Sequence, residues 1–242
     1  MKNLIITGGA GGIGQEIVKK FVRNGYFVYI LDTDLKASKK LVEELGKDKC
    51  SCANVDVRDV KALDKFVKSL GDDFALNCLI TCAGRALHNE WKPFCEQTYS
   101  TIKDSVELNL IGHLYSVYAF LPLLKNATGD RSILFVSSIN ATDCFNLSAY
   151  SSAKSGLYGF MNSTVKEFGE MGIRINTLSP GTIKTKATDV EPKEFDKLLS
   201  CTALNRFATT KNVADTAFAI CDIIDGITGQ NIVVDAGQTK IH

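Results

Sequence analysis

The sequence predicts an α/β protein with a doubly wound parallel sheet of about seven strands in a single domain. Apolar runs typical of buried strands alternate along the whole chain with segments of helical apolar spacing, and this order favours right-handed crossovers and a parallel sheet. The 242 residues, 45% of them hydrophobic, are enough to bury one large core. No repeat, low-complexity segment or domain boundary interrupts the pattern.

The first unit is a strand, a glycine-rich turn and a helix, in that order. Residues 3–6 are apolar, residues 16–22 have helical spacing, and the turn between them is Thr7-Gly8-Gly9-Ala10-Gly11-Gly12-Ile13-Gly14. Glycines allow positive φ there and let a diphosphate approach the backbone, and the helix N-terminus presents N–H groups to an anion. The turn fits both G-x-G-x-x-G and T-G-x-x-x-G-x-G, although an ordinary glycine-rich turn would fit as well.

The second strand, residues 26–31, ends at Asp32. Dinucleotide-binding units carry an acid at about this distance from the glycine turn, where it accepts hydrogen bonds from the adenosine ribose and disfavours a 2′-phosphate. We therefore expect NAD(H) to be preferred over NADP(H). Alternatively, Asp32 caps the next helix, residues 35–45, but Asp34 could take that role instead.

The next expected elements are a strand that ends in residues 53–57, a helix at about 60–70 and a strand at 75–81. Asp56 in the third strand is expected near an adenine edge. The fourth strand runs into Cys82-Ala83-Gly84, a small-residue turn that lets a cofactor approach the backbone. Residues 85–99 are irregular, and we expect either a surface excursion on the ligand side or packing.

A long helix is predicted from residue 101 to about 125, and Asn109 falls in its middle. Asparagine is a poor residue for a helix interior because its side chain competes for backbone hydrogen bonds. A local disruption or a functional water is one explanation of Asn109. A partly buried polar residue is the other.

The remaining strands are expected at residues 132–136, 174–178 and 231–235. The first of these ends in Ser137-Ser138, and the helix after it contains Tyr150 and Lys154. A spacing of four residues places both side chains on one face of that helix. The pKa of a phenol is near 10, and a neighbouring ammonium and an oxidised nicotinamide would lower it. Tyr150 could then exchange a proton with a substrate hydroxyl or carbonyl.

Composition argues against several classes of function. The net charge of +1, with acids and bases interspersed, gives no sign of a nucleic-acid or membrane partner. No signal peptide or membrane span is expected, so we predict a cytoplasmic protein. The eight cysteines contain no C-x-x-C pair and are expected as reduced thiols. The three histidines are too scattered to suggest a metal site.

In these motifs the chain resembles the short-chain dehydrogenase/reductase family over essentially its whole length, with a Rossmann-type fold. The resemblance implies a catalytic tetrad of Asn109, Ser138, Tyr150 and Lys154, with Ser137 as the alternative serine. It implies the following cofactor-binding residues: Gly8, Gly12, Ile13, Gly14, Asp32, Asp56, Val57, Ala83, Gly84, Tyr150, Lys154, Pro180, Gly181, Ile183 and Thr185. The family signature of the last strand is matched by Thr228-Gly229-Gln230 and Val234-Asp235.

The resemblance implies hydride transfer between NAD(H) and a secondary alcohol or ketone. Ser138 would hold the substrate oxygen, and Tyr150 would transfer the proton. Lys154 would lower the pKa of Tyr150 and bind the nicotinamide ribose, and Asn109 would hold a water. The family usually has Asn-Ala-Gly where this chain has Cys82-Ala83-Gly84, and we expect a structural effect of this change rather than lost activity.

The substrate is less defined by the sequence. The family places its lid at about residues 186–206, where residues 192–199 are helix-prone. Trp91, Phe145 and Leu147 could supply apolar walls or could belong to the core. No arginine or lysine is clearly aimed at a carboxylate or phosphate. A polyol, a sugar, a hydroxy acid and a 3-oxoacyl thioester are all compatible with the sequence.

Two other functions are compatible with the same motifs. One is a non-catalytic NAD(H)-binding redox sensor or scaffold, which need not keep both Tyr150 and Lys154. The other is an NADP-linked 3-oxoacyl carrier-protein reductase, which Asp32 disfavours. The resemblance also implies a homotetramer with the helices around Asn109 and Tyr150 at one interface, with a small-molecule substrate as the other partner.

Overall fold

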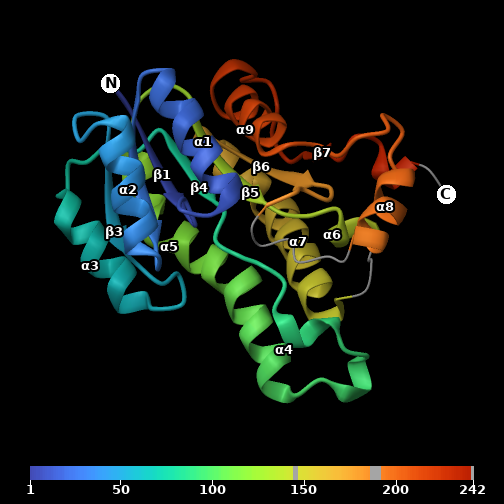
Figure 1. Cartoon of the computed structure of the whole chain (residues 1–242). Coiled ribbons are helices and arrows are strands. Elements are labelled where there is room, and N and C mark those ends of the chain that lie inside the picture. Colours follow the sequence, from blue (N-terminus) through green and yellow to red (C-terminus); the bar gives the residue numbers. More distant parts are fainter. Residues whose placement is uncertain (144–146, 186–191, 241–242) are drawn as a thin grey trace.

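Seven parallel strands form one sheet in the computed structural model of the protein, which describes residues 1–143, 147–185 and 192–240 (Figure 1). The strand order is β3-β2-β1-β4-β5-β6-β7. The strands are β1 Lys2–Thr7, β2 Tyr26–Asp32, β3 Cys50–Asn54, β4 Cys78–Thr81, β5 Arg131–Val136, β6 Ile173–Pro180 and β7 Asn231–Val234. The order reverses between β1 and β4, which confirms the predicted doubly wound parallel sheet.

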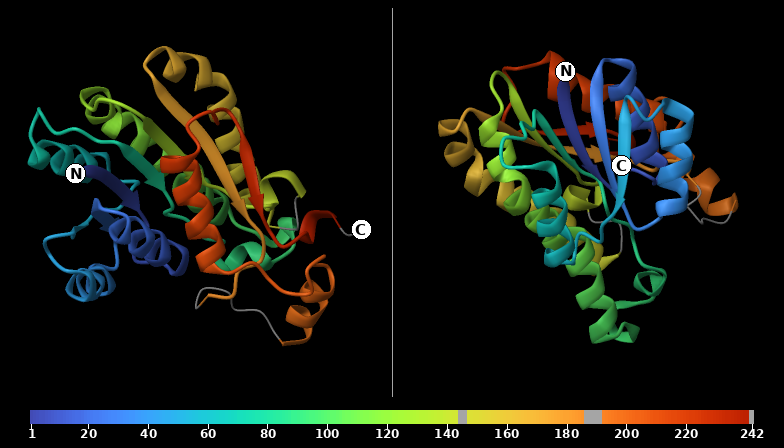
Figure 2. Two further views of the ribbon diagram at one scale, coloured as in Figure 1. Left: turned by 90° about the horizontal axis from the view of Figure 1, so that it is seen from above. Right: turned by 90° about the vertical axis from the view of Figure 1, so that its left-hand side faces the viewer.

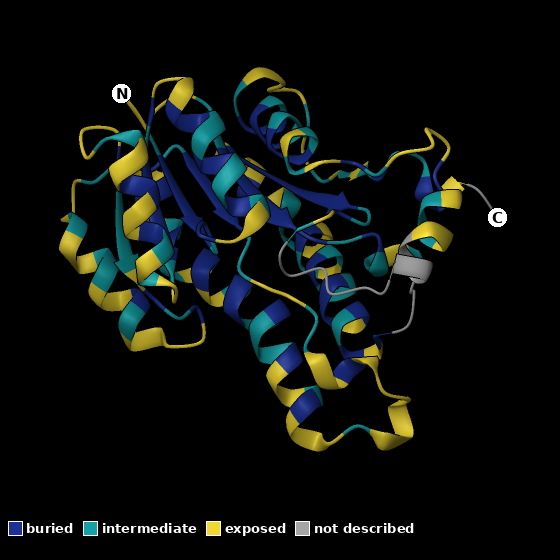
Figure 3. Cartoon of the chain, viewed as in Figure 1, coloured by how far each residue is buried: buried dark blue, intermediate teal, exposed yellow. Residues whose placement is uncertain are grey.

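Helices cover both faces of the sheet (Figure 2). One face carries α1 Gly12–Arg23, α2 Leu35–Leu45 and α9 Thr210–Phe218, and the other carries α3 Val60–Leu70, α5 Gly112–Asn126 and α7 Ser148–Glu170. Within β1, Leu4 and Ile6 pack into the first core and Ile5 into the second. Because successive side chains of a strand point to opposite faces, a strand covered on both sides is apolar throughout. The central strands β1, β4, β5 and β6 are accordingly among the most deeply buried parts of the chain (Figure 3).

Several strand boundaries differ from the prediction by up to three residues, and β4, for example, begins at Cys78 rather than at residue 75. The third strand, expected to end in residues 53–57, is Cys50–Asn54, where Val28 pairs with Cys50 and Asp32 with Asn54. The polar and cysteine residues at its start gave no apolar signal, and the apolar residues after it leave the ladder. β6 runs on to Pro180, which pairs with Val234.

The predicted long helix consists of three segments: α4 Tyr99–Val106, a π-helical turn Glu107–Ile111 and α5. Of the explanations offered for Asn109, the local disruption is therefore found, and Asn109 is also a buried polar residue. Its side-chain Nδ2 donates to the Ser105 carbonyl oxygen at 3.0 Å, the acceptor that the Asn109 backbone N–H would use in an α-helix. The helix widens by one residue there, as is frequent near functional sites.

Shorter elements complete the fold. Near the lower edge of the sheet in Figure 1, residues 85–99 and α4 project away from the body. The remaining elements are the 3₁₀ turns His88–Trp91, Phe94–Glu96 and Gln238–Lys240, the helices α6 Asn140–Asp143 and α8 Pro192–Ser200, and a π turn Ala219–Ile223. α8 agrees with the helix-prone segment 192–199, whereas α9 was not anticipated from the sequence.

Arg174 fastens β6 to the loops around it. Its guanidinium donates to both carboxylate oxygens of Asp130 at 2.8 and 2.6 Å, and to the carbonyls of Ile220, Ile227 and Cys221. The Arg174 side chain is only 10% exposed. Its removal would leave one partly buried carboxylate and the carbonyl oxygens of Ile220 and Cys221 without this donor.

We therefore expect Arg174→Ala to lower the free energy of unfolding by about 3–5 kcal/mol, measured by urea unfolding. Lys211→Ala is the matched control, because the Lys211 side chain is 77% exposed in its pair with Asp215. That control should stay within about 1 kcal/mol of wild type. Equal losses in the two variants would contradict the role given to Arg174.

Candidate active site

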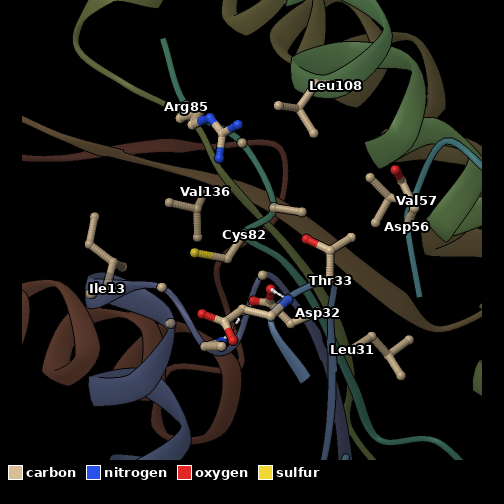
Figure 4. A pocket seen from close by; sticks show the side chains of 18 of the residues that line it. Ile13, Leu31, Asp32, Thr33, Asp56, Val57, Cys82, Arg85, Leu108 and Val136 are labelled. Atoms are coloured by element: carbon tan, nitrogen blue, oxygen red, sulfur yellow. Dashed lines mark hydrogen bonds between the residues drawn. The ribbon is translucent and has the colours of Figure 1, made fainter. Parts of the chain in front are cut away.

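A pocket of about 610 Å³ lies at the carboxyl ends of the central strands, where the strand order reverses (Figure 4). This switch point is where α/β sheets of this type bind ligands. The predicted site residues that line it are Gly8, Gly12, Ile13, Gly14, Asp32, Asp56, Val57, Ala83, Gly84, Tyr150, Lys154 and Thr185. Asn109, Ser138, Pro180, Gly181 and Ile183 are not in its wall, and Ser137 is.

The glycine turn forms a cradle that side chains would fill. Gly8 has φ +70°, and a Cβ there would lie 2.6 Å from the Ala83 backbone. A Cβ on Gly14 would collide with the Gly8 carbonyl oxygen. α1 begins at Gly12, and the preceding Gly11 offers no side-chain cap. The first N–H groups of the helix therefore face a groove without side chains, which fits the diphosphate of a dinucleotide.

Asp32 joins the end of β2 to the glycine turn. Its carboxylate accepts hydrogen bonds from the backbone N–H groups of Ala10 and Asp34, each at 2.9 Å. The cap of α2 is Asp34, whose Oδ1 accepts from Ala37 N at 2.9 Å. The alternative role of Asp32 as a helix cap is therefore wrong, and its carboxylate stays in the pocket wall (Figure 4).

Asp56 is held by an arginine that the sequence analysis did not consider. Arg58 donates from Nη2 to Asp56 Oδ2 at 2.6 Å and from Nε to Oδ1 at 3.0 Å. These hydrogen bonds lower the pKa of Asp56. An adenine edge placed here would meet a carboxylate already engaged by Arg58.

The π turn brings Asn109 behind the turn that follows β4. A Cβ on Gly84 would lie 2.6 Å from Asn109 Oδ1 and 3.2 Å from Lys154 Nζ. The side-chain amide of Asn109 hydrogen-bonds with the backbone of Arg85, the residue after Gly84. It accepts from Arg85 N at 2.9 Å and donates to Arg85 O at 3.0 Å. Asn109 and Lys154 thus approach each other from different helices, on either side of Gly84.

Lys154 is buried and directed toward β5. Its Nζ donates to the Val136 carbonyl at 2.9 Å and lies 5.8 Å from the centroid of the Tyr150 ring. Burial disfavours the ammonium and lowers the pKa of Lys154 to about 8. The side chain is therefore still largely protonated at neutral pH.

The surroundings of Tyr150 raise its pKa, whereas a pKa lowered by Lys154 was expected. Burial raises the pKa of Tyr150 to about 12, with smaller raising contributions from Glu90 and Cys82, and a hydrogen bond with Ser138 lowers it. The lowered pKa expected from Lys154 is not found among the protein's own groups. Desolvation of the phenolate outweighs the lowering hydrogen bond with Ser138.

The two serines after β5 point in different directions. Ser137 is buried, and its Oγ donates to the Lys154 carbonyl at 3.3 Å. Ser138 Oγ accepts from Asn140 N at 3.2 Å and is the hydroxyl that meets Tyr150. The side chain of Ser138, rather than that of Ser137, therefore faces the phenol.

The turn after β6 is fastened by the C-terminal segment. Gln238 accepts from Thr182 N at 2.9 Å and donates to Thr182 Oγ1 at 3.0 Å. A Cβ on Gly181 would collide with Asp235, 2.6 Å from its Cβ. The chain then returns to the glycine turn, because a Cβ on Gly12 would lie 3.0 Å from Thr185 Cγ2. Pro180 and Gly181 thus support the pocket from behind, while Thr185 enters its wall.

Sequence reasoning missed several residues of this region. Arg85 lies in the pocket wall with its guanidinium directed inward (Figure 4), although no base was expected to aim at an anion. Glu90 is almost completely buried, and Gln238 holds the β6 turn. Such residues lie in irregular segments, so no spacing pattern marks them.

Trp91 and Leu147 line a second cavity, of about 760 Å³, between residues 90–97 and the start of α7. They are not in the wall of the pocket that contains Tyr150. Phe145 and residues 186–191 of the expected lid lie outside the described residues. Within the described ranges, no group of three metal-ligating side chains occurs, and no helix is long and apolar enough to span a membrane.

Known proteins share both the sequence pattern and the fold. Cyclohexanol dehydrogenase of Acinetobacter sp. (strain SE19) is 30% identical, over 99% of this chain and 95% of that protein. The 3-oxoacyl-(acyl-carrier-protein) reductase of Chlamydia pneumoniae is also 30% identical, over 98% of this chain and 97% of that protein.

Solved structures of similar proteins have the same fold as this chain. A short chain dehydrogenase/reductase from Burkholderia thailandensis has a TM-score of 0.89 at 31% identity, over 98% of this chain and 92% of that one. A 3-oxoacyl-(acyl-carrier protein) reductase from Brucella melitensis with bound NAD has a TM-score of 0.88 at 27% identity, covering 98% and 90%. ElxO with NADP bound has a TM-score of 0.87 at 25% identity, over 98% of both chains.

The sequence model of the short chain dehydrogenase family matches residues 2–196. Together with the parallel sheet, the glycine cradle and the meeting of Tyr150, Ser138 and Lys154, this match establishes that the protein belongs to the short-chain dehydrogenase/reductase family.

Proposed function

We propose that the protein is an NAD(H)-dependent oxidoreductase acting on a secondary alcohol or the corresponding ketone. The observation that carries this proposal is the meeting of the Tyr150 hydroxyl with Ser138 above Lys154, at the end of a pocket that begins at the glycine turn. A phenol, a hydroxyl and an ammonium in this arrangement can hold a substrate oxygen and move its proton.

A bound nicotinamide would supply the hydride donor or acceptor. In this proposal the uncapped N–H groups of α1 bind the diphosphate, and Asp32 accepts hydrogen bonds from the adenosine ribose. Lys154 holds the nicotinamide ribose, and Asn109 orders a water beside it. Ser138 holds the substrate oxygen while Tyr150 gives or takes its proton.

The preference for NAD(H) over NADP(H) rests on Asp32. Its carboxylate lies in the pocket wall, and the residues that follow it, Thr33 and Asp34, are not basic. A 2′-phosphate would meet negative charge there. Similar proteins have been solved with NAD and with NADP, so this preference is the part of the cofactor assignment that most needs measurement.

The substrate class is proposed from the site and the relatives together. Polyols, sugars and hydroxy acids suit an acid/base tyrosine, and the similar cyclohexanol dehydrogenase adds ring alcohols to the panel. The similarity to a 3-oxoacyl-(acyl-carrier-protein) reductase supports a thioester substrate as the second candidate. A non-catalytic redox sensor is the third, and both Tyr150 and Lys154 would be unnecessary in it.

We also propose a homotetramer, as the family resemblance implies. Tyr99 on α4 and Tyr118 on α5 are 94% and 83% exposed, which supports an interface over these helices. The cytoplasmic location and the lid at residues 186–206 stay predictions from the sequence.

Tyr150→Phe should lower turnover at least about 100-fold, since general acid–base catalysis contributes that much or more. The dissociation constant of NADH, measured by fluorescence, should stay close to that of wild type because only one hydroxyl is removed. Retained turnover in the variant would exclude Tyr150 as the acid/base.

Wild-type protein should bind NADH at least about 10-fold more tightly than NADPH, a difference of about 1.4 kcal/mol, in calorimetric titrations. Asp32→Ser should reduce this ratio. Asp59→Ser is the matched control: it changes a helix-capping carboxylate, at the start of α3, that is not in the pocket wall, and it should leave the ratio unchanged. Equal dissociation constants in wild type would refute the role of Asp32.

A further inference from the structure

Glu90 is a buried carboxylate that contacts three separate elements. Its side chain belongs to the irregular segment after β4, and the residue is only 1% exposed. Oε2 accepts from Leu87 N at 2.6 Å in the same turn. Oε1 accepts from Ser105 Oγ on α4 and from Tyr150 N on α7, each at 2.8 Å. A carboxylate is this deeply buried only where hydrogen bonds satisfy its oxygens.

The contact with Tyr150 falls in the first turn of α7, which begins at Ser148. The first N–H groups of a helix have no partner inside it and are usually bonded by a side chain of the preceding residue. Leu147 occupies that position with φ 54° and provides no such bond. Glu90 therefore caps the helix from a distant point of the chain, where a negative charge is also favoured by the helix dipole.

The same contacts connect Tyr150 to Asn109. Ser105, which donates to Glu90, also accepts from Asn109 Nδ2 through its carbonyl oxygen at 3.0 Å. Asn109 in turn forms two hydrogen bonds with the backbone of Arg85. The segment from Arg85 to Glu90 is thus fastened at one end to the π turn and at the other to α7.

Glu90 also contributes charge to the surroundings of the phenol. The groups that face Tyr150 are Ser138 after β5, Cys82 after β4, Lys154 on α7 and Glu90. Burial raises the pKa of the Cys82 thiol to about 12, so that thiol is neutral at physiological pH. Glu90 is therefore the carboxylate among these groups, and it opposes ionisation of the phenol.

We propose that Glu90 is a positioning residue for Tyr150: it caps α7 from the segment after β4 and adds a negative charge beside the acid/base tyrosine. The electrostatic half of this inference rests on the proposed function of Tyr150, and the capping half does not. The irregular segment 85–99 is then a part of the catalytic architecture rather than a surface excursion alone.

The cap is tested without substrate by hydrogen exchange of the full-length protein. In Glu90→Ala the cap is lost, and peptides that cover residues 148–152 should exchange about 10-fold faster. In Glu90→Gln an oxygen acceptor remains but the charge that favours the helix N-terminus is gone, so the increase should be smaller. Glu96→Gln, which changes an exposed carboxylate in the same segment, is the matched control. Unchanged exchange in both Glu90 variants would overturn the cap.

The charge is tested by the pH dependence of alcohol oxidation, which requires ionised Tyr150 and therefore rises with pH. Glu90→Gln keeps an oxygen acceptor for Tyr150 N but removes the charge, so the midpoint of kcat/KM should move to lower pH. Glu96→Gln should leave the midpoint in place. Glu90→Ala should also lose about 10- to 100-fold in kcat, because the tyrosine is displaced, with little change in NADH binding.

Two outcomes would overturn this half of the proposal: a midpoint that stays in place, or one that moves to higher pH in Glu90→Gln. A purely structural role would lower activity at every pH without the downward shift. If wild type oxidised no alcohol while binding NADH, the proposed function would fail and the electrostatic role with it. The exchange experiment would still decide the cap on its own.

Discussion

The close approach of two backbones at the centre of the sheet is the constraint on which the site depends. The turn after β1 lies directly against the turn after β4, so that even one methyl group on Gly8 would overlap the Ala83 backbone. This contact brings the uncapped start of α1 beside Gly84, and Gly84 in turn leaves room for Asn109 and Lys154. The anion-binding turn and the acid/base residues thereby share one pocket.

Residues with regular spacing could be predicted from the sequence alone. The glycine turn follows an apolar strand, and Asp32 lies at the end of the next one. Tyr150 and Lys154 are spaced so that they share one face of a helix. All of these residues line the same pocket. Asn109 was informative for a different reason, because an asparagine within a helical pattern conflicts with helix propensity. The conflict is resolved by the π turn that surrounds it.

What could not be predicted depends on contacts between distant segments. Glu90 has no period and no local signal, and its role arises only when the segment after β4 packs against α7. The raised pKa of Tyr150 has a similar origin, because burial is a property of the assembled site and outweighs the hydrogen bond with Ser138 that lowers this pKa. The end of the third strand was placed too late because register with β2, rather than apolar character, fixes where pairing stops.

Direct hydride transfer from the carbinol carbon of a secondary alcohol to NAD can be followed by isotope transfer. Wild-type protein would be incubated with NAD and a panel of secondary alcohols deuterated at the carbinol carbon, including ring alcohols, polyols and hydroxy acids. We expect deuterium from at least one alcohol to appear at C4 of the reduced nicotinamide. Tight binding of NAD without deuterium transfer from any alcohol or hydroxy acid would contradict this expectation and would favour a non-catalytic NAD(H)-binding protein.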